Sequence, residues 1–530
     1  MTQTSHARRG VQFLGVAVAC AALWLAPVVA AAAQIAPSAE AQGPYQTLVI
    51  RDATVIDGTG APAAGPYDIV IKGDRITDLV PVSALAIARG ATRPTGDRVI
   101  EAKGMYVMPG LIDMHVHVSS NKNVPKDYIY KLFLGSGVTT VRTFNIGTDT
   151  PAQMVAERDA ILANKELGPR IYVYPFYQAN SGPDASTPDG ARKIVDQWHT
   201  LGVDGVKLVG MPGEYPDTLR AIGAEARKND MGLAVHIVQQ AVHQMNAVDV
   251  CQAGASSVEH HYGYAEAAFS DKTIQDLPSD YNYSNEAMRF LWTGQVWLQT
   301  DMHKLHTKVI DQLLDCYHST GWTMDPTFVV YEGNRDVERV QNLPWHKDYT
   351  LPAMMDYWAP NVEHHASFYF HWTSMNEAIW ARMYRRWLDF VNDYKNHGGA
   401  VSVGSDSGSI YDLWGFGTIR ELELLENAGF NPLETIHAAT EAGAVNLGNQ
   451  KLGVIRAGYL ADLVVLTENP LDDIKVLYGT GATRIGANNK IEQTSALKYT
   501  IRGGVVYDSQ ALLRDVRAMV AQAKGRKATQ

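Results

Sequence analysis

The central part of this 530-residue chain alternates short apolar runs with longer helix-like stretches, and no other feature limits the possible folds as strongly. The runs are LIDMHVHV (111–118), GVTTVRTF (137–144), RIYVYP (170–175), GVKLVG (205–210), GLAVHI (232–237), SSVEHH (256–261), PTFVVYE (326–332) and AVSVGSDSG (400–408). Helix-like segments such as 217–229 and 308–319 lie between them. Buried strands that alternate with helices are typical of parallel α/β folds. Eight such runs predict a (β/α)8 TIM-like barrel, with a doubly wound sheet as the structural alternative.

Both flanks of this central part have a different texture. Residues 46–108 alternate Val and Ile with Asp-Gly and Gly-Asp breaks, which is typical of short strands and hairpins, and the same texture returns in 451–508. We therefore expect a small β-sandwich domain assembled from both ends of the chain. The barrel is expected at 109–450, and a C-terminal helix or tail at 509–530.

The N-terminus has the pattern of a secretory signal peptide. Arg8 and Arg9 precede an apolar run at 11–33, which ends in alanines before Gln34. A permanent membrane anchor is the alternative, because the run is long enough to span a bilayer. We expect residues 1–33 to be a cleaved signal peptide, which implies a periplasmic or extracellular protein that meets the membrane only during export.

Composition excludes several classes of function. The formal net charge is −10, and no long run of basic residues occurs, so no nucleic-acid partner is expected. Only Cys251 and Cys316 remain after the predicted signal peptide. In an oxidising compartment they could form one disulfide, and two separate buried thiols are the other possibility.

Residues of metal-ligand type recur at the carboxyl ends of the predicted strands, where barrel active sites lie. These residues are His115, His117, Lys207, His236, His260 and Asp406. Because alternate residues of a strand point the same way, His115 and His117 can chelate one ion while Val116 faces away. His261 points to the opposite side from His260, so we expect it to pack or to support the site from behind.

The motifs at both ends of the central part resemble those of the amidohydrolase superfamily of metal-dependent hydrolases. MPGLIDMHVHV resembles the first-strand motif of that superfamily, and GSDSG, NPLETIHAATEAGAVNLG and GVIRAGYLADLVVL resemble its eighth strand, last helix and return to the β-domain. The resemblance covers roughly residues 47–508. It is strongest to the branch that contains imidazolonepropionase-like proteins and Xaa-Pro dipeptidases.

The resemblance implies a role for each candidate residue. His115 and His117 match ligands of the more buried metal ion, and His236 and His260 match ligands of the second. Lys207 matches a lysine that becomes carbamylated and bridges both ions. Asp406 matches a catalytic carboxylate that binds metal and transfers the proton of the nucleophilic water.

The cofactors that this implies are two divalent metal ions, with Zn²⁺ expected, which share a hydroxide that attacks a carbonyl. Burial of Lys207 would favour the neutral amine that takes up carbon dioxide. The loops after the second and third predicted strands depart from the pattern of the superfamily, so no relative's substrate can be transferred directly.

Two connections in the barrel region, 262–322 and 333–399, are longer than one helix with its loops. They contain most of the tryptophans, namely Trp292, Trp297, Trp322, Trp345, Trp358, Trp372, Trp380 and Trp387. Aromatic residues at helical spacing usually pack in helix cores or at an interface, which allows a homo-oligomer. Alternatively, they cover the catalytic rim and favour apolar substrates. Tyr331, which we place at the end of the seventh strand, is the candidate to hydrogen-bond a substrate carbonyl or carboxylate.

Together these patterns predict an exported, binuclear metal-dependent amidohydrolase that hydrolyses an amide or peptide bond. The expected partner is a small molecule with an apolar group, such as a dipeptide or an N-acyl amino acid. Esters and lactones are open to the same attack. The alternatives are a mononuclear cyclic-amide hydrolase or deaminase of the same superfamily, and an inactive binding relative.

Overall fold

The computed structural model describes residues 41–118, 124–146, 148–269, 279–282, 285–360, 372–494 and 496–528. The predicted signal peptide, 1–33, lies outside the described residues. None of the described helices combines the length and apolar composition that a membrane span requires.

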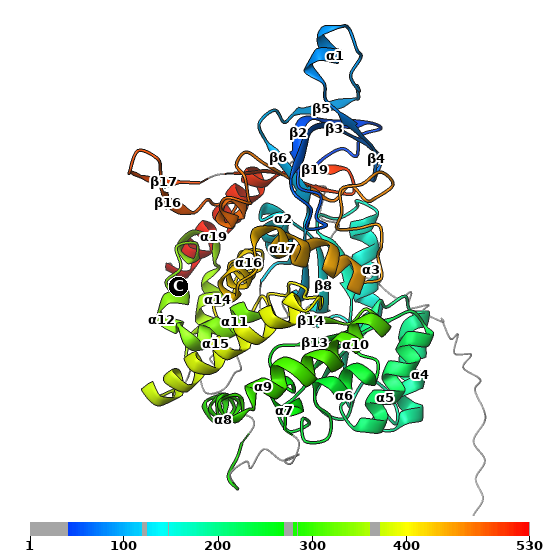
Figure 1. Cartoon of the computed structure of the whole chain (residues 1–530), viewed down its shortest axis with the longest axis vertical. Coiled ribbons are helices and arrows are strands. Elements are labelled where there is room, and N and C mark those ends of the chain that lie inside the picture. The colour runs from blue at the N-terminus through cyan, green and yellow to red at the C-terminus, as the bar shows by residue number, and fades with distance from the viewer. Residues whose placement is uncertain are drawn as a thin grey trace, which may run out of the picture. The chain divides into compact units, whose positions relative to one another are not determined.

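Strands from the two ends of the chain form one mixed nine-stranded sheet, drawn in blue and in orange to red in Figure 1. Its strands are β1 (Ala41–Gln42), β2 (Leu48–Val55), β3 (Ala64–Lys72), β4 (Arg75–Pro81), β5 (Arg98–Glu101), β6 (Tyr106–Pro109), β15 (Leu463–Leu466), β18 (Leu497–Arg502) and β19 (Val505–Asp508). The two ends meet where β6 pairs with β15, Val107 lying opposite Val465. This sheet has its own core, which includes Ile50, Ile69 and Ile501. The prediction that both ends build one β-rich part is confirmed, and its strands form a single hydrogen-bonded sheet.

The central part contains parallel strands in two sheets. The first sheet holds β7 (Leu111–Val118), β8 (Val138–Ile146) and β9 (Arg170–Val173), and the second holds β10 (Phe176–Tyr177), β11 (Gly205–Val209), β12 (Gly232–His236), β13 (Ser257–Glu259) and β14 (Thr323–Asp325). Six of the predicted runs coincide with strands, so the α/β fold is confirmed.

Backbone hydrogen bonds join the two sheets on both sides. On one side, Asp204 N–H donates to the Val173 carbonyl at 3.1 Å. On the other side the eighth predicted run, 400–408, passes between β14 and β7. Ser402 N–H donates to the Met324 carbonyl at 2.9 Å, and Asp406 N–H donates to the His115 carbonyl at 2.7 Å. The parallel strands therefore form a continuous ring in which this segment makes isolated bridges to its neighbours.

The prediction of a seventh strand at 326–332 is wrong. The strand is β14 (Thr323–Asp325), and the apolar run after it is helix α11 (Phe328–Arg335). The run FVVY has the β-branched and aromatic character of a strand, but tertiary contacts decide its structure. Both carboxylate oxygens of Glu421 accept backbone N–H groups at the start of α11, from Phe328 and Val329. This capping satisfies donors that the first turn of a helix leaves without partners.

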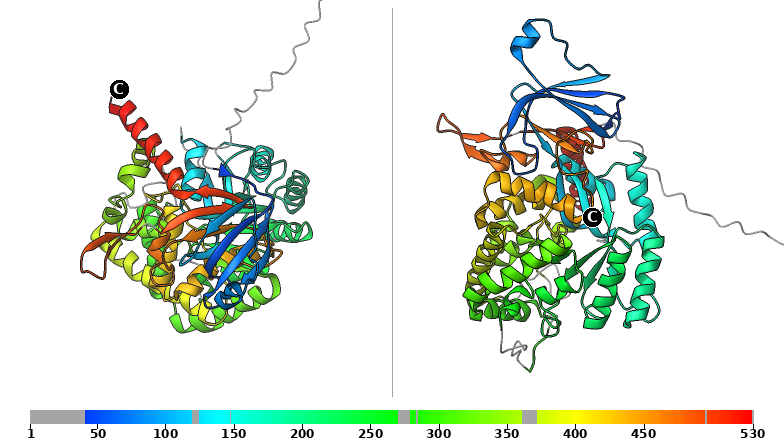
Figure 2. Two further views of the ribbon diagram at one scale, coloured as in Figure 1. Left: turned by 90° about the horizontal axis from the view of Figure 1, so that it is seen from above. Right: turned by 45° about the vertical axis from the view of Figure 1, so that its right-hand side comes forward.

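Helices surround the ring of parallel strands (Figure 2). Those in its first half are α2 (Lys126–Gly135), α3 (Pro151–Leu162), α4 (Pro188–Thr200), α5 (Pro216–Lys228) and α6 (Ala247–Gln252), whereas α1 (Ala84–Ala88) belongs to the β-rich part, at its tip in Figure 1. Prolines begin α3, α4 and α5, a position where the missing N–H costs nothing. Side chains of Thr150 and Thr187 cap α3 and α4. Helices α3 and α4 therefore start where the sequence supplies both a cap and a proline.

The remaining helices come from the two long connections and the C-terminal part. They are α7 (Tyr264–Ala267), α8 (Glu286–Gln299), α9 (Met302–Lys304), the π-helical turn η1 (Leu305–Val309), α10 (Ile310–Thr320), α12 (Val337–Val340), α13 (His346–Tyr349), α14 (Pro352–Trp358), α15 (Ser374–Asn396), α16 (Phe416–Ala428), α17 (Pro432–His437), η2 (Ala438–Ala442), α18 (Gly443–Asn446), the 3-10 turn η3 (Ile474–Leu477) and α19 (Ser509–Ala528). A separate hairpin joins β16 (Thr483–Ile485) to β17 (Ile491–Gln493). The helix predicted after residue 508 is α19.

Most tryptophans of the long connections are packed inside the protein. Those that are fully buried are Trp297, Trp322, Trp358, Trp380 and Trp387. Trp292, Trp345 and Trp372 are half-buried. Packing of helix cores therefore accounts for five of the eight.

A disulfide joins Cys251 of α6 to Cys316 of α10, across a sequence separation of 65 residues. Of the two possibilities left open by the sequence, the structure has the bonded pair. The bond connects the helix before β13 to the helix before β14. It therefore restrains two adjacent strands of the ring.

We expect reduction of this disulfide to lower the free energy of unfolding by about 2–4 kcal/mol, because the cross-link restricts the unfolded chain. Urea denaturation with and without a thiol reductant measures the difference. The double variant Cys251→Ala/Cys316→Ala should not respond to the reductant. Detection of two titratable thiols in denatured, unreduced protein would contradict the prediction.

Candidate active site

The alternation of β7 places His115 and His117 on the same side of the strand, facing Asp406. His117 Nε2 lies 2.9 Å and His115 Nε2 lies 3.4 Å from Asp406 Oδ1. Asp406 is held by its backbone bond to His115. Burial opposes ionisation of Asp406, but the two histidines outweigh this effect and lower its pKa. Two imidazole nitrogens and one ionised carboxylate therefore converge on one point.

Hydrogen bonds on the opposite ring nitrogens orient three of the candidate histidines. His115 Nδ1 lies 2.6 Å from Glu259 Oε2, and His117 Nδ1 lies 2.9 Å from Asn145 Oδ1. His260 Nδ1 lies 2.6 Å from Thr327 Oγ1. Partners on Nδ1 leave Nε2 directed into the site, the arrangement by which proteins prepare histidines for metal ions.

His236 and His260 lie beside this pair. The ring of His260 is centred 5.0 Å from that of His115 and 4.5 Å from that of His236. One ligand atom from each of His115, His260 and Asp406 falls within 4.8 Å of the others, close enough to hold one metal ion. Burial lowers the pKa of His115 to about 4 and holds that of His260 well below its usual value, so both rings are neutral and can donate a lone pair.

Lys207 of β11 is fully buried in the same interior. Its Nζ lies 4.0 Å from the ring centre of Phe144 and 3.8 Å from Glu259 Oε2. Burial lowers the pKa of Lys207 to about 8. A substantial fraction of neutral amine therefore exists near neutral pH.

The backbone is strained at three residues of this site. His260, Thr327 and Asp406 have φ angles of 67°, 52° and 60°, in the left-handed region that L-residues seldom occupy. Each such residue costs on the order of 1–3 kcal/mol and persists only where its surroundings fix it. The hydrogen bond from His260 N–H to the Asp325 carbonyl, at 2.9 Å, is one such restraint.

Sequence reasoning missed a buried charge network beneath the histidines. Arg142 of β8 donates to Glu259 and to Asp325, both at 3.0 Å, and all three side chains are fully buried. Burial favours neutral Glu259, but Arg142 and Lys207 outweigh this and hold its pKa well below its usual value. His115, Glu259 and Asp325 also form a cluster that could hold a metal ion. In this cluster the guanidinium of Arg142 already supplies the positive charge that a metal ion would otherwise bring.

Asp113, on the same side of β7 as His115 and His117, is a second residue that the sequence did not single out. Its carboxylate accepts from Thr418 Oγ1 at 2.6 Å and from Ser405 N–H at 2.9 Å. Burial raises its pKa to about 6. Asp113 therefore anchors the segment that carries Asp406.

Tyr331 lies on α11 and not at the end of a strand, which corrects its predicted position. Its ring centre is 5.3 Å from that of His260 and 4.7 Å from that of His261. His261 packs among aromatic side chains that include Trp380 and Trp387, as expected for a residue behind the site. Tyr331 therefore reaches the site from α11.

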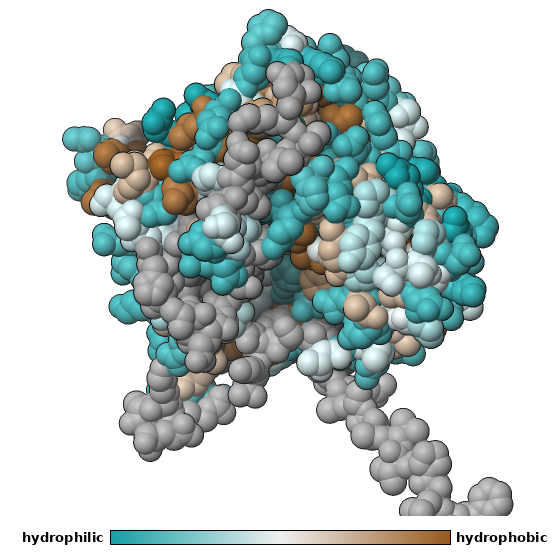
Figure 3. All heavy atoms as spheres, turned by 90° about the horizontal axis from the view of Figure 1, so that it is seen from below, coloured by the Kyte–Doolittle hydropathy of each residue, from teal (hydrophilic) through white to brown (hydrophobic). Residues whose placement is uncertain are grey.

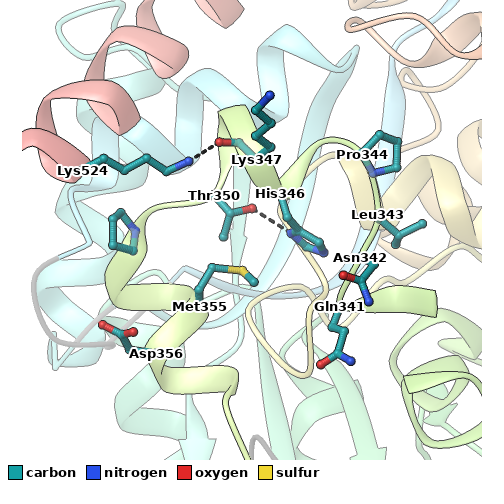
Figure 4. Close-up of a pocket in the computed structure, with 11 residues that line it drawn as sticks. Gln341, Asn342, Leu343, Pro344, His346, Lys347, Thr350, Met355, Asp356 and Lys524 are labelled. Atoms are coloured by element: carbon teal, nitrogen blue, oxygen red, sulfur yellow. Dashed lines mark hydrogen bonds between the residues drawn. The ribbon is translucent and has the colours of Figure 1, made fainter. Parts of the chain in front are cut away.

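Two cavities are candidates for a ligand-binding site, and they differ in whether candidate site residues line them. One, of about 480 Å³, is lined by His236, residues 209–211 at the end of β11, Val238, Gln240 and Arg289. The other, of about 860 Å³, lies between residues 341–356 and Lys524 of α19 (Figure 4). No candidate site residue lines the larger cavity, and its buried His346 is engaged by Thr350 and the Val340 carbonyl. Figure 3 shows a hollow near the centre of the face seen from below.

Imidazoles, a carboxylate and a buried lysine in this arrangement are typical of the active sites of metal-dependent hydrolases. Comparison with known proteins leads to the same class. The model of the amidohydrolase family matches residues 106–277 and 386–506, more than half of the chain. The chain therefore belongs to the amidohydrolase family.

Individual proteins resemble this chain either over a short stretch or at low sequence identity. The ochratoxinase of Aspergillus niger is 40% identical over 82 residues, which span 15% of this chain and only 16% of that protein. A Xaa-Pro dipeptidase structure with bound methionine has a TM-score of 0.57 at 19% identity, covering 87% of this chain and 100% of the other. A prolidase complexed with N-methylphosphonate-L-proline has a TM-score of 0.55 at 20% identity, covering 87% and 99%. The two structures establish likeness of fold.

We expect Arg142→Met to lower the free energy of unfolding by about 3–5 kcal/mol, because it leaves the buried Glu259 carboxylate without its nearest cation and Asp325 without the Arg142 donor. Urea denaturation at pH 7 measures the change. Arg385→Met is the matched control, since Arg385 and Asp389 pair with side chains about half exposed, and it should cost less than about 1 kcal/mol. Equal losses in the two variants would show that Arg142 has no special structural role.

Proposed function

We propose that this protein is an exported, binuclear metal-dependent amidohydrolase that cleaves an amide or peptide bond in a small substrate with an apolar group. The observation that carries the proposal is the convergence of His115, His117 and Asp406 beside the other candidate residues. Within this proposal the ring of parallel strands is a (β/α)8 barrel with residues 400–408 as its eighth strand, and the mixed sheet is the β-sandwich domain.

The donor set fits two divalent ions. His115, His117 and Asp406 would hold one ion, and His236 and His260 the other. Neutral imidazoles whose Nδ1 atoms are engaged elsewhere suit Zn²⁺. When bound, such ions polarise a carbonyl and bring the pKa of water near neutrality.

Lys207 is the proposed bridge between the two ions, as a carbamate. Its burial and its pKa of about 8 support this role, because carbon dioxide reacts with the neutral amine. Arg142 offsets the negative charge of Glu259 nearby. The interior can therefore hold an additional anionic group.

The chain's own residues then perform the proton transfer. Asp406 is ionised, so it can accept a proton from the attacking water and pass it to the departing nitrogen. Glu259 fixes the ring of His115, and Asp113 fixes the segment of Asp406. Tyr331 is the proposed hydrogen-bond partner of the substrate.

The known relatives support a small amide or peptide substrate. The structural neighbours include a Xaa-Pro dipeptidase with bound methionine and a prolidase with a proline analogue. An exported location is supported by the disulfide, since such bonds persist in oxidising compartments. We therefore favour N-acyl amino acids and dipeptides as substrates.

We expect purified, metal-replete protein to contain about two divalent ions per chain by elemental analysis. His117→Ala should lose one ion and reduce the rate more than about tenfold, because a ligand is removed.

Lys207→Ala should lose metal and activity, and a short carboxylic acid should partly restore both. His397→Ala, an exposed histidine, is the control and should keep both ions. One ion with full activity would favour the mononuclear alternative.

The substrate class is tested by a panel of N-acyl amino acids and dipeptides with glycine, leucine or phenylalanine side chains, beside a phosphotriester and an aminopurine. We expect the amides with bulky apolar side chains to have the highest kcat/KM, since the site is surrounded by aromatic side chains. Clear preference for the phosphotriester or the aminopurine would reject the amidase proposal and leave the metal site intact.

A further inference from the structure

The cavity next to His236 is built by two strand-end loops and one helix of the first long connection. Val209 ends β11 and residues 210–211 follow it, Val238 and Gln240 follow β12, and Arg289 comes from α8. Its volume, about 480 Å³, is within the range of small-molecule sites. A ligand in this cavity would lie beside His236, which lines it.

A buried carboxyl group fixes the two loops. Glu214 accepts from Gly210 N–H at 2.5 Å and from Val238 N–H at 3.0 Å, so one side chain joins both walls of the cavity. Gln239, also buried, connects the second loop to α8, since its side-chain amide lies 3.0 Å from Thr293 Oγ1. Arg289 is one turn before Thr293 on that helix. The turn of α8 that carries Arg289 is therefore held beside the cavity wall.

Arg289 gives this cavity a positive charge. Its side chain is 3% exposed, and its guanidinium carbon lies 4.8 Å from the ring centre of Phe290. No Asp or Glu occurs among the described residues that line the cavity.

A guanidinium suits one class of ligand. It is always charged, and its planar set of N–H donors matches the two oxygens of a carboxylate. Because it has several donors, it can bind a substrate oxygen in addition to a protein acceptor. Val209, Met211 and Val238 supply apolar wall around it.

We propose that Arg289 is a specificity-determining residue that binds a carboxylate of the substrate, so that the preferred substrates are amides of amino acids with a free carboxylate. This inference rests on the proposed function. It adds a named residue from the long connection and predicts discrimination against neutral analogues.

The test compares the best-cleaved N-acyl amino acid or dipeptide of the panel with its C-terminal carboxamide. A charge-assisted hydrogen bond contributes about 1.5–3 kcal/mol, so wild-type kcat/KM should favour the carboxylate about 10- to 150-fold, mainly through KM. Arg289→Gln should reduce this preference below about threefold. Arg289→Lys should retain part of the preference, and Arg382→Gln, at an exposed arginine of α15, should retain all of it.

Calorimetric binding of 3-phenylpropionate and of the neutral ketone 4-phenylbutan-2-one, neither of which contains an amide bond, provides a readout without turnover. We expect wild type to bind the carboxylate more tightly and Arg289→Gln to bind the two alike. Equal binding of both ligands by wild type, or an undiminished preference in Arg289→Gln, would overturn the inference. If no amide of the panel is cleaved but the binding preference depends on Arg289, the proposed function fails and the carboxylate site stands.

Discussion

The ion cluster of Arg142, Glu259 and Asp325 is the interaction on which the rest of the site depends. Arg142 belongs to β8, and it donates to the Met114 carbonyl of β7 at 2.5 Å, to Glu259 of β13 and to Asp325 of β14. One guanidinium therefore joins four strands across the interior of the ring. Charges buried this deeply are stable only when paired and hydrogen-bonded. These bonds restrain the four strands relative to one another, next to the strand ends that carry the histidines.

The catalytic geometry follows from this closure. Glu259, held by Arg142, lies against His115 Nδ1 and directs the other ring nitrogen toward Asp406. The left-handed backbone of His260 and Asp406 would be unfavourable in an isolated loop. Here the backbone bonds to Asp325 and His115 hold both residues in place. Stability of the paired strands thus supports strain at the residues that would perform the chemistry.

Sequence reasoning succeeded where a repeated pattern exists. Alternation along β7 and the ends of parallel strands brought His115, His117 and Asp406 together as expected. It failed for features without periodicity. The seventh strand is only three residues, Thr323–Asp325, and the longer apolar run beside it is a helix capped by Glu421 from α16. Arg142 was missed because a single buried arginine in a strand resembles any surface arginine until its partners, distant in sequence, are known.

Strands and connections contribute differently to function. The family match covers 106–277 and 386–506, which contain the candidate metal ligands, and it omits the segment that carries α8 and α11. Arg289 and Tyr331 lie in that omitted segment, on elements that reach the cavity or the histidines. The ring can keep one hydrolytic arrangement while the long connection changes what binds beside it. The cavity beside His236 thus combines walls from the family-matched strand ends with Arg289 from the unmatched segment, and that segment is where this chain can differ from its relatives in what it binds.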